Sequence, residues 1–177
     1  VQIAGNHTNL IGLEKDGQIL VQKAYIQGGK ADKTDHGILS VEKIVAFADT
    51  VEIARVKPVL DRQIACNMAI AEEGLRGDWG ANIGSVLLNA YGDTVFNRAK
   101  AYAAAGSDAR MSGCEKPVMI VSGSGNQGLT ASLPVKIYAD SYVIGKDRML
   151  RSLVVSNLIA IHQKQYIGSL SAYCGAV

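Results

Sequence analysis

The apolar residues of this 177-residue chain change their spacing after about residue 38, and this change constrains the fold more than any other feature. Before it, short apolar runs at 10–13 and 19–21 flank a turn that contains Asp16-Gly17. Asp-Gly between apolar runs is a strong hairpin signal. After it, apolar residues recur at helical spacing. The sequence therefore predicts a mainly α (α+β) fold, with an N-terminal β-hairpin followed by a helical body of about five to six helices.

A polar, glycine-bearing stretch at 28–37 separates the two patterns. We therefore assign residues 1–30 to the β-hairpin segment and residues 31–177 to a helical domain of catalytic type. The chain starts at Val1 without an initiator Met, and no capping or breaking residue follows its last segment, which stops at Val177. We expect a fragment of a longer protein, in which the hairpin belongs to a larger N-terminal portion and the helical domain continues past its present C-terminus.

Capping and breaking residues divide the helical domain into segments. Ser40 is expected to cap the first helix, and Pro58 to mark a break or the first turn of the second. Residues 107–128 are expected to be mostly loop or element ends. The expected helices are 41–53, a second one running to Glu73, Asn82–Ala105 stopped by Gly106–Asp108, Leu129–Val143, Asp147–Gln165, and Gly168 to the end.

Composition restricts the class of protein. The chain is 48% hydrophobic and 19% charged, and its net charge is only +2, which gives no support to a nucleic-acid or membrane partner. No apolar stretch reaches the 18 residues that a membrane span needs. Three widely spaced cysteines, Cys66, Cys114 and Cys174, fit neither a disulfide scaffold nor a zinc knuckle. We expect a cytoplasmic protein.

The most informative segment joins the apolar run Val118–Val121 to a loop of Ser, Gly, Asn and Gln that precedes a helix. Glycines let the backbone turn tightly, and the helix start offers free N–H groups with a partial positive charge, which together suit a carboxylate or a phosphate. A purely structural turn fits equally well, whereas a phosphate loop lacks its Gly-Lys-Ser/Thr. The candidate ligand-binding residues are Ser122, Gly123, Ser124, Gly125, Asn126, Gln127 and Gly128.

Polar residues near the N-terminus form a weaker candidate site. His7 lies between Asn and Thr residues that can fix its tautomer, so His7 and Asn9 are possible contributors, although a plain turn before a strand explains them as well. Cys114, close to Lys116, is a possible thiolate, and Cys66 is expected in the core. No Ser-His-Asp order or carboxylate pair identifies a catalytic base.

Two segments, 122–135 and 168–175, resemble the L-cysteine desulfidase family, which is related to the alpha chain of iron–sulfur L-serine dehydratases. Residues 111–114 and 5–9 also resemble that pattern. The resemblance implies an oxygen-sensitive [4Fe–4S] lyase that removes the β-substituent and ammonia from L-cysteine and leaves pyruvate. L-Serine is the alternative substrate, and a non-catalytic amino-acid-binding module is the alternative of another class.

The resemblance also assigns roles to residues. Residues 122–128 match a loop that holds the substrate carboxylate, and Cys174 matches a cluster-binding cysteine. Cys114 matches a position that is not counted as a ligand. The other cluster cysteines of the family lie in motifs that this sequence lacks, so this chain alone is expected to hold no intact cluster and to be inactive. The expected partners are a small L-amino acid and a second copy in a homodimer.

Overall fold

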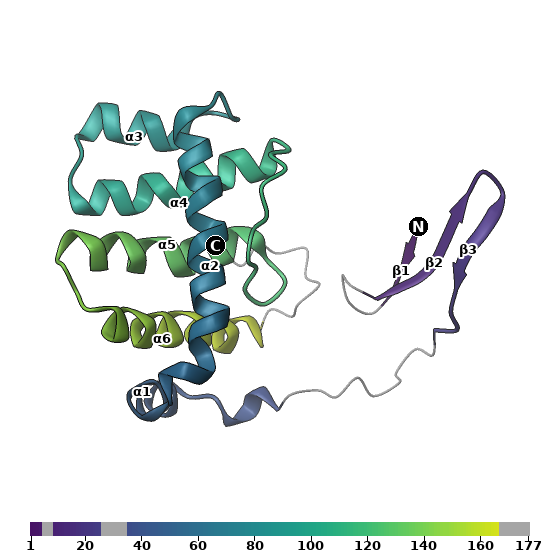
Figure 1. The fold of residues 1–177 in the computed structure, drawn as a ribbon, viewed down its shortest axis with the longest axis horizontal. Coiled ribbons are helices and arrows are strands. Elements are labelled where there is room, and N and C mark those ends of the chain that lie inside the picture. Colours follow the sequence, from purple (N-terminus) through teal and green to yellow (C-terminus); the bar gives the residue numbers. More distant parts are fainter. Residues whose placement is uncertain (5–8, 26–34, 167–177) are drawn as a thin grey trace.

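The computed structural model describes residues 1–4, 9–25 and 35–166, and its elements form two groups (Figure 1). The first is a three-stranded antiparallel sheet in the order β1-β2-β3. The second is a helical body, which agrees with the mainly α (α+β) fold predicted from the sequence. The elements are β1 (Gln2–Ile3), β2 (Leu10–Lys15), β3 (Gln18–Gln22), the short 3-10 helix η1 (His36–Ile38), α1 (Val41–Thr50), α2 (Ile53–Arg76), α3 (Ile83–Tyr91), α4 (Val95–Met111), α5 (Gly125–Ser141) and α6 (Lys146–Lys164).

The predicted hairpin is confirmed. Asp16 and Gly17 connect β2 to β3 with φ angles of 52° and 79°. Positive φ at both central residues is typical of the turn whose twist matches that of the paired strands. The strand β1 adds a third member that the sequence pattern did not predict, because two residues are too few to show a period.

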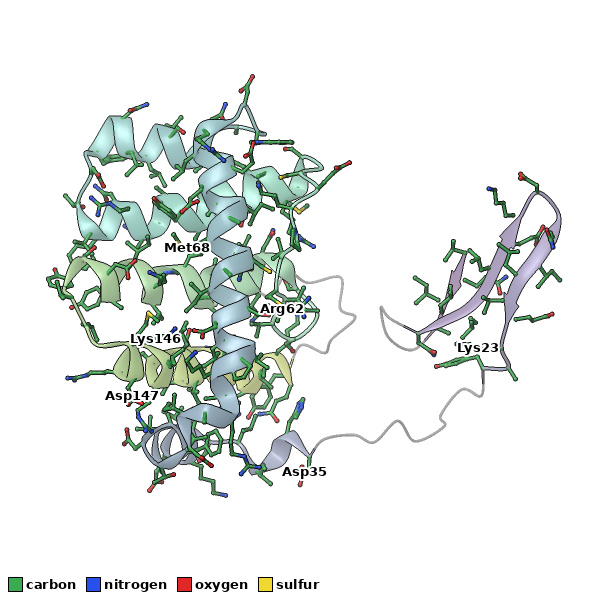
Figure 2. All side chains as sticks on the ribbon, viewed as in Figure 1. Lys23, Asp35, Arg62, Met68, Lys146 and Asp147 are labelled. Atoms are coloured by element: carbon green, nitrogen blue, oxygen red, sulfur yellow. The ribbon has the colours of Figure 1, made fainter. Side chains whose placement is uncertain are left out.

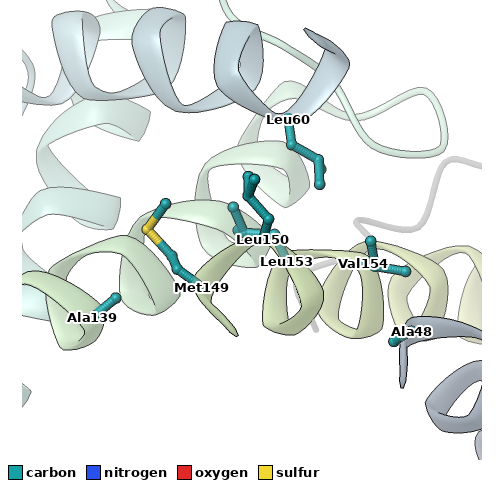
Figure 3. Packing of buried hydrophobic residues seen from close by; sticks show 7 residues of the cluster. All are labelled: Ala48, Leu60, Ala139, Met149, Leu150, Leu153 and Val154. Atoms are coloured by element: carbon teal, nitrogen blue, oxygen red, sulfur yellow. The ribbon is translucent and has the colours of Figure 1, made fainter. Parts of the chain in front are cut away.

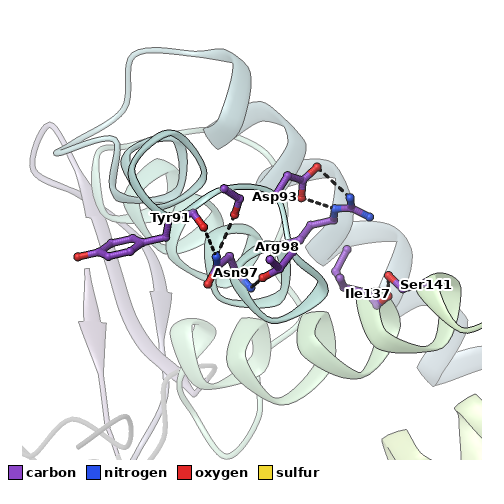
Figure 4. A network of polar contacts seen from close by, with 8 residues as sticks. Tyr91, Asp93, Asn97, Arg98, Ile137 and Ser141 are labelled. Atoms are coloured by element: carbon purple, nitrogen blue, oxygen red, sulfur yellow. Dashed lines mark hydrogen bonds and ion pairs between the residues drawn. The ribbon is translucent and has the colours of Figure 1, made fainter.

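The prediction of one helix over 82–105 is wrong, because the chain breaks between α3 and α4. Gly92, with φ 77°, follows the last residue of α3, and the Thr94 hydroxyl caps α4 by accepting from the Asn97 backbone N–H. The Asn97 side-chain amide donates to the Tyr91 and Gly92 carbonyls at 2.9 Å each, which holds the corner (Figure 4). Local polar contacts therefore end α3 and start α4 within four residues.

Gly106 does not end α4, which continues to Met111. A β-carbon on Gly106 would lie 3.1 Å from the Leu129 side chain, so this glycine allows α4 to approach α5. The predicted stop at Gly106–Asp108 is therefore wrong. Pro58 neither breaks the chain nor begins a helix, since it lies in the second turn of α2.

The first predicted helix ends earlier than expected, and the last described one is close to the prediction. α1 begins after the Ser40 cap and ends at Thr50, whereas the prediction ran to residue 53. Lys146 and Asp147 begin α6 (Figure 2). The helix expected from Gly168 onward lies outside the described residues. Over residues 1–4, 9–25 and 35–166, no helix has the length and apolar character needed to cross a membrane.

The helix α2 crosses α4, α5 and α6, and most of the core lies against it (Figure 1). One buried cluster joins α1, α2, α5 and α6 (Figure 3): Ala48, Leu60, Ala139, Met149, Leu150, Leu153 and Val154. A second joins α2, α4 and α5: Ile70, Ala71, Ala109, Leu129 and Leu133. Small residues on α2 and α4 let these helices approach closely, because a β-carbon on Gly74 would lie only 2.1 Å from the Ala105 carbonyl oxygen.

An exposed ion-pair group links the surfaces of α2 and α6. Asp61 lies 2.6 Å from the Lys57 ammonium and 3.0 Å from the Lys146 ammonium. Hydrogen bonds from Lys57 and then Lys146 hold the pKa of Asp61 below its usual value. Since these groups are solvent-exposed, they contribute little to stability compared with the packing beneath them.

The close approach of α2 and α4 predicts a strong effect of adding one methyl group. Replacing Gly74 by Ala is expected to reduce the free energy of unfolding by about 1–3 kcal/mol, because the backbone at Ala105 cannot yield as a side chain would. Urea unfolding measures the change. The control is Gly145→Ala, where a β-carbon has open space and the loss is expected to stay below about 1 kcal/mol. Equal losses in the two variants would contradict the packing argument.

Candidate functional site

The apolar segment before α5 ends in a tight turn at residues 121–124. Backbone hydrogen bonds of 3.0 Å join Val121 and Ser124 in both directions. Ser122 and Gly123, the two residues between them, have φ angles of 47° and 85°. The left-handed region is costly for a serine, and such strain is found most often at functional sites. The turn brings Gly123 to the surface and leaves Ser122 and Ser124 half-buried.

α5 begins at Gly125, four residues earlier than the helix predicted from Leu129. Ser124 is its N-cap, and the Ser124 hydroxyl accepts from the Gln127 backbone N–H at 3.2 Å. Four of the seven candidate residues, 125–128, are therefore the first turn of a helix and not a loop. The spacing of Ser124 and Gln127 is that of a capping box, and this local signal was available in the sequence.

The first turn of α5 presents backbone donors. Gln127 and Gly128 give their N–H groups to Ser124, whereas the N–H groups of Gly125 and Asn126 have no partner among the described residues. The start of a helix carries a partial positive charge in addition to such free donors. An anionic group is therefore the favoured occupant of this position.

Arg110 brings a full positive charge to the same place. Its Nη1 donates to the Asn126 side-chain oxygen at 3.0 Å. A β-carbon on Gly125 would lie 2.3 Å from Arg110 Nε, so the guanidinium lies directly against the first turn of α5. The sequence reasoning missed Arg110 because it ended the preceding helix too early. With α4 extended to Met111, its last turn carries this arginine to the site.

Asn67 of α2 fixes the turn relative to α5 and is fully buried. Its amide nitrogen donates to the Gly128 carbonyl at 3.1 Å and to the Ser132 hydroxyl at 2.9 Å. Its amide oxygen accepts from the Met119 backbone N–H at 2.9 Å. A β-carbon on Gly128 would lie 2.1 Å from the Met119 carbonyl oxygen, so the two segments lie in direct contact. No local pattern indicated Asn67, because its partners are 52 to 65 residues away.

The other candidate residues are not brought to this site by the described structure. The Asn9 amide donates to the Ala4 carbonyl at 2.7 Å, and Ala4 N–H donates back to the Asn9 carbonyl at 3.2 Å, so Asn9 joins β1 to β2. His7 and Cys174 lie outside the described residues. Cys114 is half-buried and packs against the Ile70 cluster.

An iron–sulfur cluster requires several thiolate ligands. Within the part of the chain that the structure describes, no three His, Cys, Asp or Glu side chains are grouped closely enough to hold a metal ion. The cysteines there are Cys66, on α2, and Cys114, after α4. The described residues therefore do not fit a [4Fe–4S] cluster, and we derive no chemical step through one.

A helical body that presents an anion site at a helix start agrees with the comparison to known proteins. Residues 15–177 match the serine dehydratase alpha chain family, and the chain belongs to that family. This confirms the resemblance to that family inferred from the sequence.

The most similar curated proteins are much longer than this chain. A UPF0597 protein of Desulfitobacterium hafniense is 54% identical over the whole chain, which covers 41% of that protein. UPF0597 proteins of Lachnoclostridium phytofermentans and Fusobacterium nucleatum are 51% and 45% identical over the whole chain, covering 42% and 43% of their lengths. The chain thus spans less than half the length of these relatives. No solved structure matches it.

The role of Asn67 predicts a large stability loss on truncation. Asn67→Ala is expected to reduce the free energy of unfolding by about 2–3 kcal/mol, because it leaves buried backbone and hydroxyl groups without partners. Arg62→Ala, at an exposed position of the same helix, is the control and is expected to stay within about 0.5 kcal/mol. Urea unfolding compares the two. A loss for Asn67→Ala no greater than for the control would show that this network does not hold the turn.

Proposed function

We propose that residues 122–128 bind the carboxylate of a small L-amino acid, and that the chain is part of a lyase acting on L-cysteine. The observation that supports this most directly is the guanidinium of Arg110 lying against the donor-bearing first turn of α5, in a member of the serine dehydratase alpha chain family. A cation beside the positive end of a helix is unfavourable unless an anion joins them.

The groups at the site suit a carboxylate. The N–H groups of Gly125 and Asn126 donate to its oxygens, and Arg110 supplies the opposing charge. The Ser124 hydroxyl already accepts from the Gln127 N–H, so its own proton is available to donate to the ligand. Fixing the carboxylate orients the α-carbon and β-carbon, between which the elimination takes place.

The proposed reaction begins with loss of the α-proton to a base and of the β-thiol as sulfide. The product, 2-aminoacrylate, tautomerises to an imine and takes up water to give pyruvate and ammonia. The resemblance to the cysteine desulfidase branch favours L-cysteine, with L-serine and loss of water as the alternative. The family resemblance also leads us to propose a [4Fe–4S] cofactor, with Cys174 as one ligand, for the longer protein.

A non-catalytic amino-acid-binding module is the second candidate. It is supported by the observation that the described residues build an anion site but no cluster site.

Activity assays separate the lyase from the module. We expect the 177-residue chain, reconstituted anaerobically with iron and sulfide, to release no pyruvate from L-cysteine or L-serine. The full-length Desulfitobacterium hafniense relative, treated identically, is expected to release pyruvate and sulfide from L-cysteine faster than pyruvate from L-serine. Pyruvate release by the short chain would disprove its expected inactivity. Amino-acid binding by the relative without pyruvate from either substrate would favour the module.

Arg110 and Gly125 test the carboxylate site directly. Arg110→Ala is expected to weaken L-serine binding about tenfold by removing the charge from the carboxylate. Gly125→Ala is expected to act in the same direction, because its new β-carbon displaces the guanidinium without disturbing any backbone. Arg110→Lys, which keeps the charge, should lose less. Binding is measured by amide shifts in NMR titrations, which detect millimolar affinities.

The control for these variants is Gly145→Ala at the start of α6, where the added carbon meets nothing. It is expected to bind L-serine as the unmodified chain does. If neither Arg110→Ala nor Gly125→Ala changes binding, the carboxylate lies elsewhere.

A further inference from the structure

Gln127 carries an unsatisfied acceptor in the first turn of α5. The residue is only 6% exposed, and its Oε1 has no hydrogen-bond partner among the described residues. Buried polar atoms without partners are uncommon in folded proteins, and each calls for an explanation. Trp79 Nε1 is the other such side-chain atom in the described part of the chain, but Trp79 packs in the Ile70 cluster, away from the turn.

The turn before α5 explains why Oε1 lacks a partner. In a complete capping box, the side chain at the third helical position accepts from the backbone N–H of the N-cap residue. Here the N-cap is Ser124, and its N–H instead donates to the Val121 carbonyl at 3.0 Å. Only half of the box forms, through the Gln127 N–H and the Ser124 hydroxyl. The tight turn thus takes the donor that Gln127 would otherwise use.

We propose that Gln127 Oε1 accepts a hydrogen bond from the α-ammonium group of the amino acid whose carboxylate lies on the first turn of α5. This inference rests on the proposed carboxylate site. A carboxylate has no proton to give, so an additional acceptor beside it does not serve the carboxylate. The neighbouring ammonium of an α-amino acid has three donors, and one of them matches the free acceptor of Gln127.

The site therefore distinguishes an amino acid from the acid that lacks the amino group. Without an ammonium, Oε1 stays buried and unsatisfied, and sites of this kind reject ligands that lack the matching donor. The same logic favours product release, since pyruvate has no donor for Oε1 once ammonia is lost. Because Oε1 is covered in the free chain, its side chain rotates toward the turn on binding, and the new hydrogen bond favours the bound state.

The experiment compares L-serine with 3-hydroxypropanoate, which has the same carboxylate and hydroxyl but no ammonium. The unmodified chain is expected to bind L-serine at least tenfold more tightly in NMR titrations. In Gln127→Met, which has nearly the same shape without the acceptor, L-serine binding falls about tenfold and 3-hydroxypropanoate binding changes less than twofold. The control, Gln163→Met at an exposed position of α6, keeps the original preference. The melting temperature of Gln127→Met is not lowered, because no protein partner of Oε1 is lost.

A second variant protects the test against misfolding and against a reversed amide. Gln127→Glu keeps an acceptor, so its preference for L-serine over 3-hydroxypropanoate equals or exceeds that of the unmodified chain, although the added charge weakens both. Loss of that preference in Gln127→Glu, or an unchanged preference in folded Gln127→Met, overturns the role of Oε1 and leaves the carboxylate site standing. If the unmodified chain binds neither acid, the proposed function fails first and this inference with it.

Discussion

The buried carboxamide of Asn67 is the contact on which the geometry of the site depends. It meets the Met119 N–H ahead of the turn, and the Gly128 carbonyl and Ser132 hydroxyl of α5, so one side chain of α2 sets the position of both parts of the site. A buried amide is stabilising only when its groups are paired, and a shift of one residue between the segments would leave several unpaired at once. The same network that stabilises the core therefore positions the first turn of α5.

The electrostatics of the helix starts distinguish α5 from its neighbours. Carboxylates lie at the first turns of α1 and α6, where Glu42 and Asp147 follow the caps, and at α3, whose Ile83 N–H donates to Asp108 at 2.8 Å. The first turn of α5 contains no acidic residue, and the charged group against it is the guanidinium of Arg110. A carboxylate offsets the positive end of each of those other helices, whereas at α5 a cation adds to it. A bound carboxylate would supply the missing negative charge.

Local signals in the sequence account for the parts of the fold that were predicted correctly. Asp16-Gly17 specifies the hairpin through its backbone preferences, and Ser40 specifies the start of α1 through its hydroxyl. Gly106 shows the limit of such signals, since glycine both ends helices and permits close packing, and only its contact with Leu129 decides between them. The polar corner that separates α3 from α4 is also local, but it lies within a stretch that is helical in pattern on both sides.

The candidate site divides in the same way. The turn and the start of α5 lie within a single stretch of sequence, and the capping-box spacing of Ser124 and Gln127 was sufficient to begin the helix at Gly125. Asn67 and Arg110 reach the site through the packing of α2 and α4 on α5. Nothing in the residues next to them indicates that packing, so one sequence without a structure cannot connect them to the turn.

The choice of glutamine at position 127 follows from two competing requirements. A glutamate there would suit both the positive end of α5 and a capping box, and would be expected if stability of the helix were the only demand. Its negative charge would also attract the Arg110 guanidinium and repel a carboxylate on the Gly125 and Asn126 N–H groups. Glutamine keeps the acceptor and omits the charge. Because the Ser124 N–H is committed to Val121, that acceptor contributes little to the helix and remains available to a donor placed beside the carboxylate.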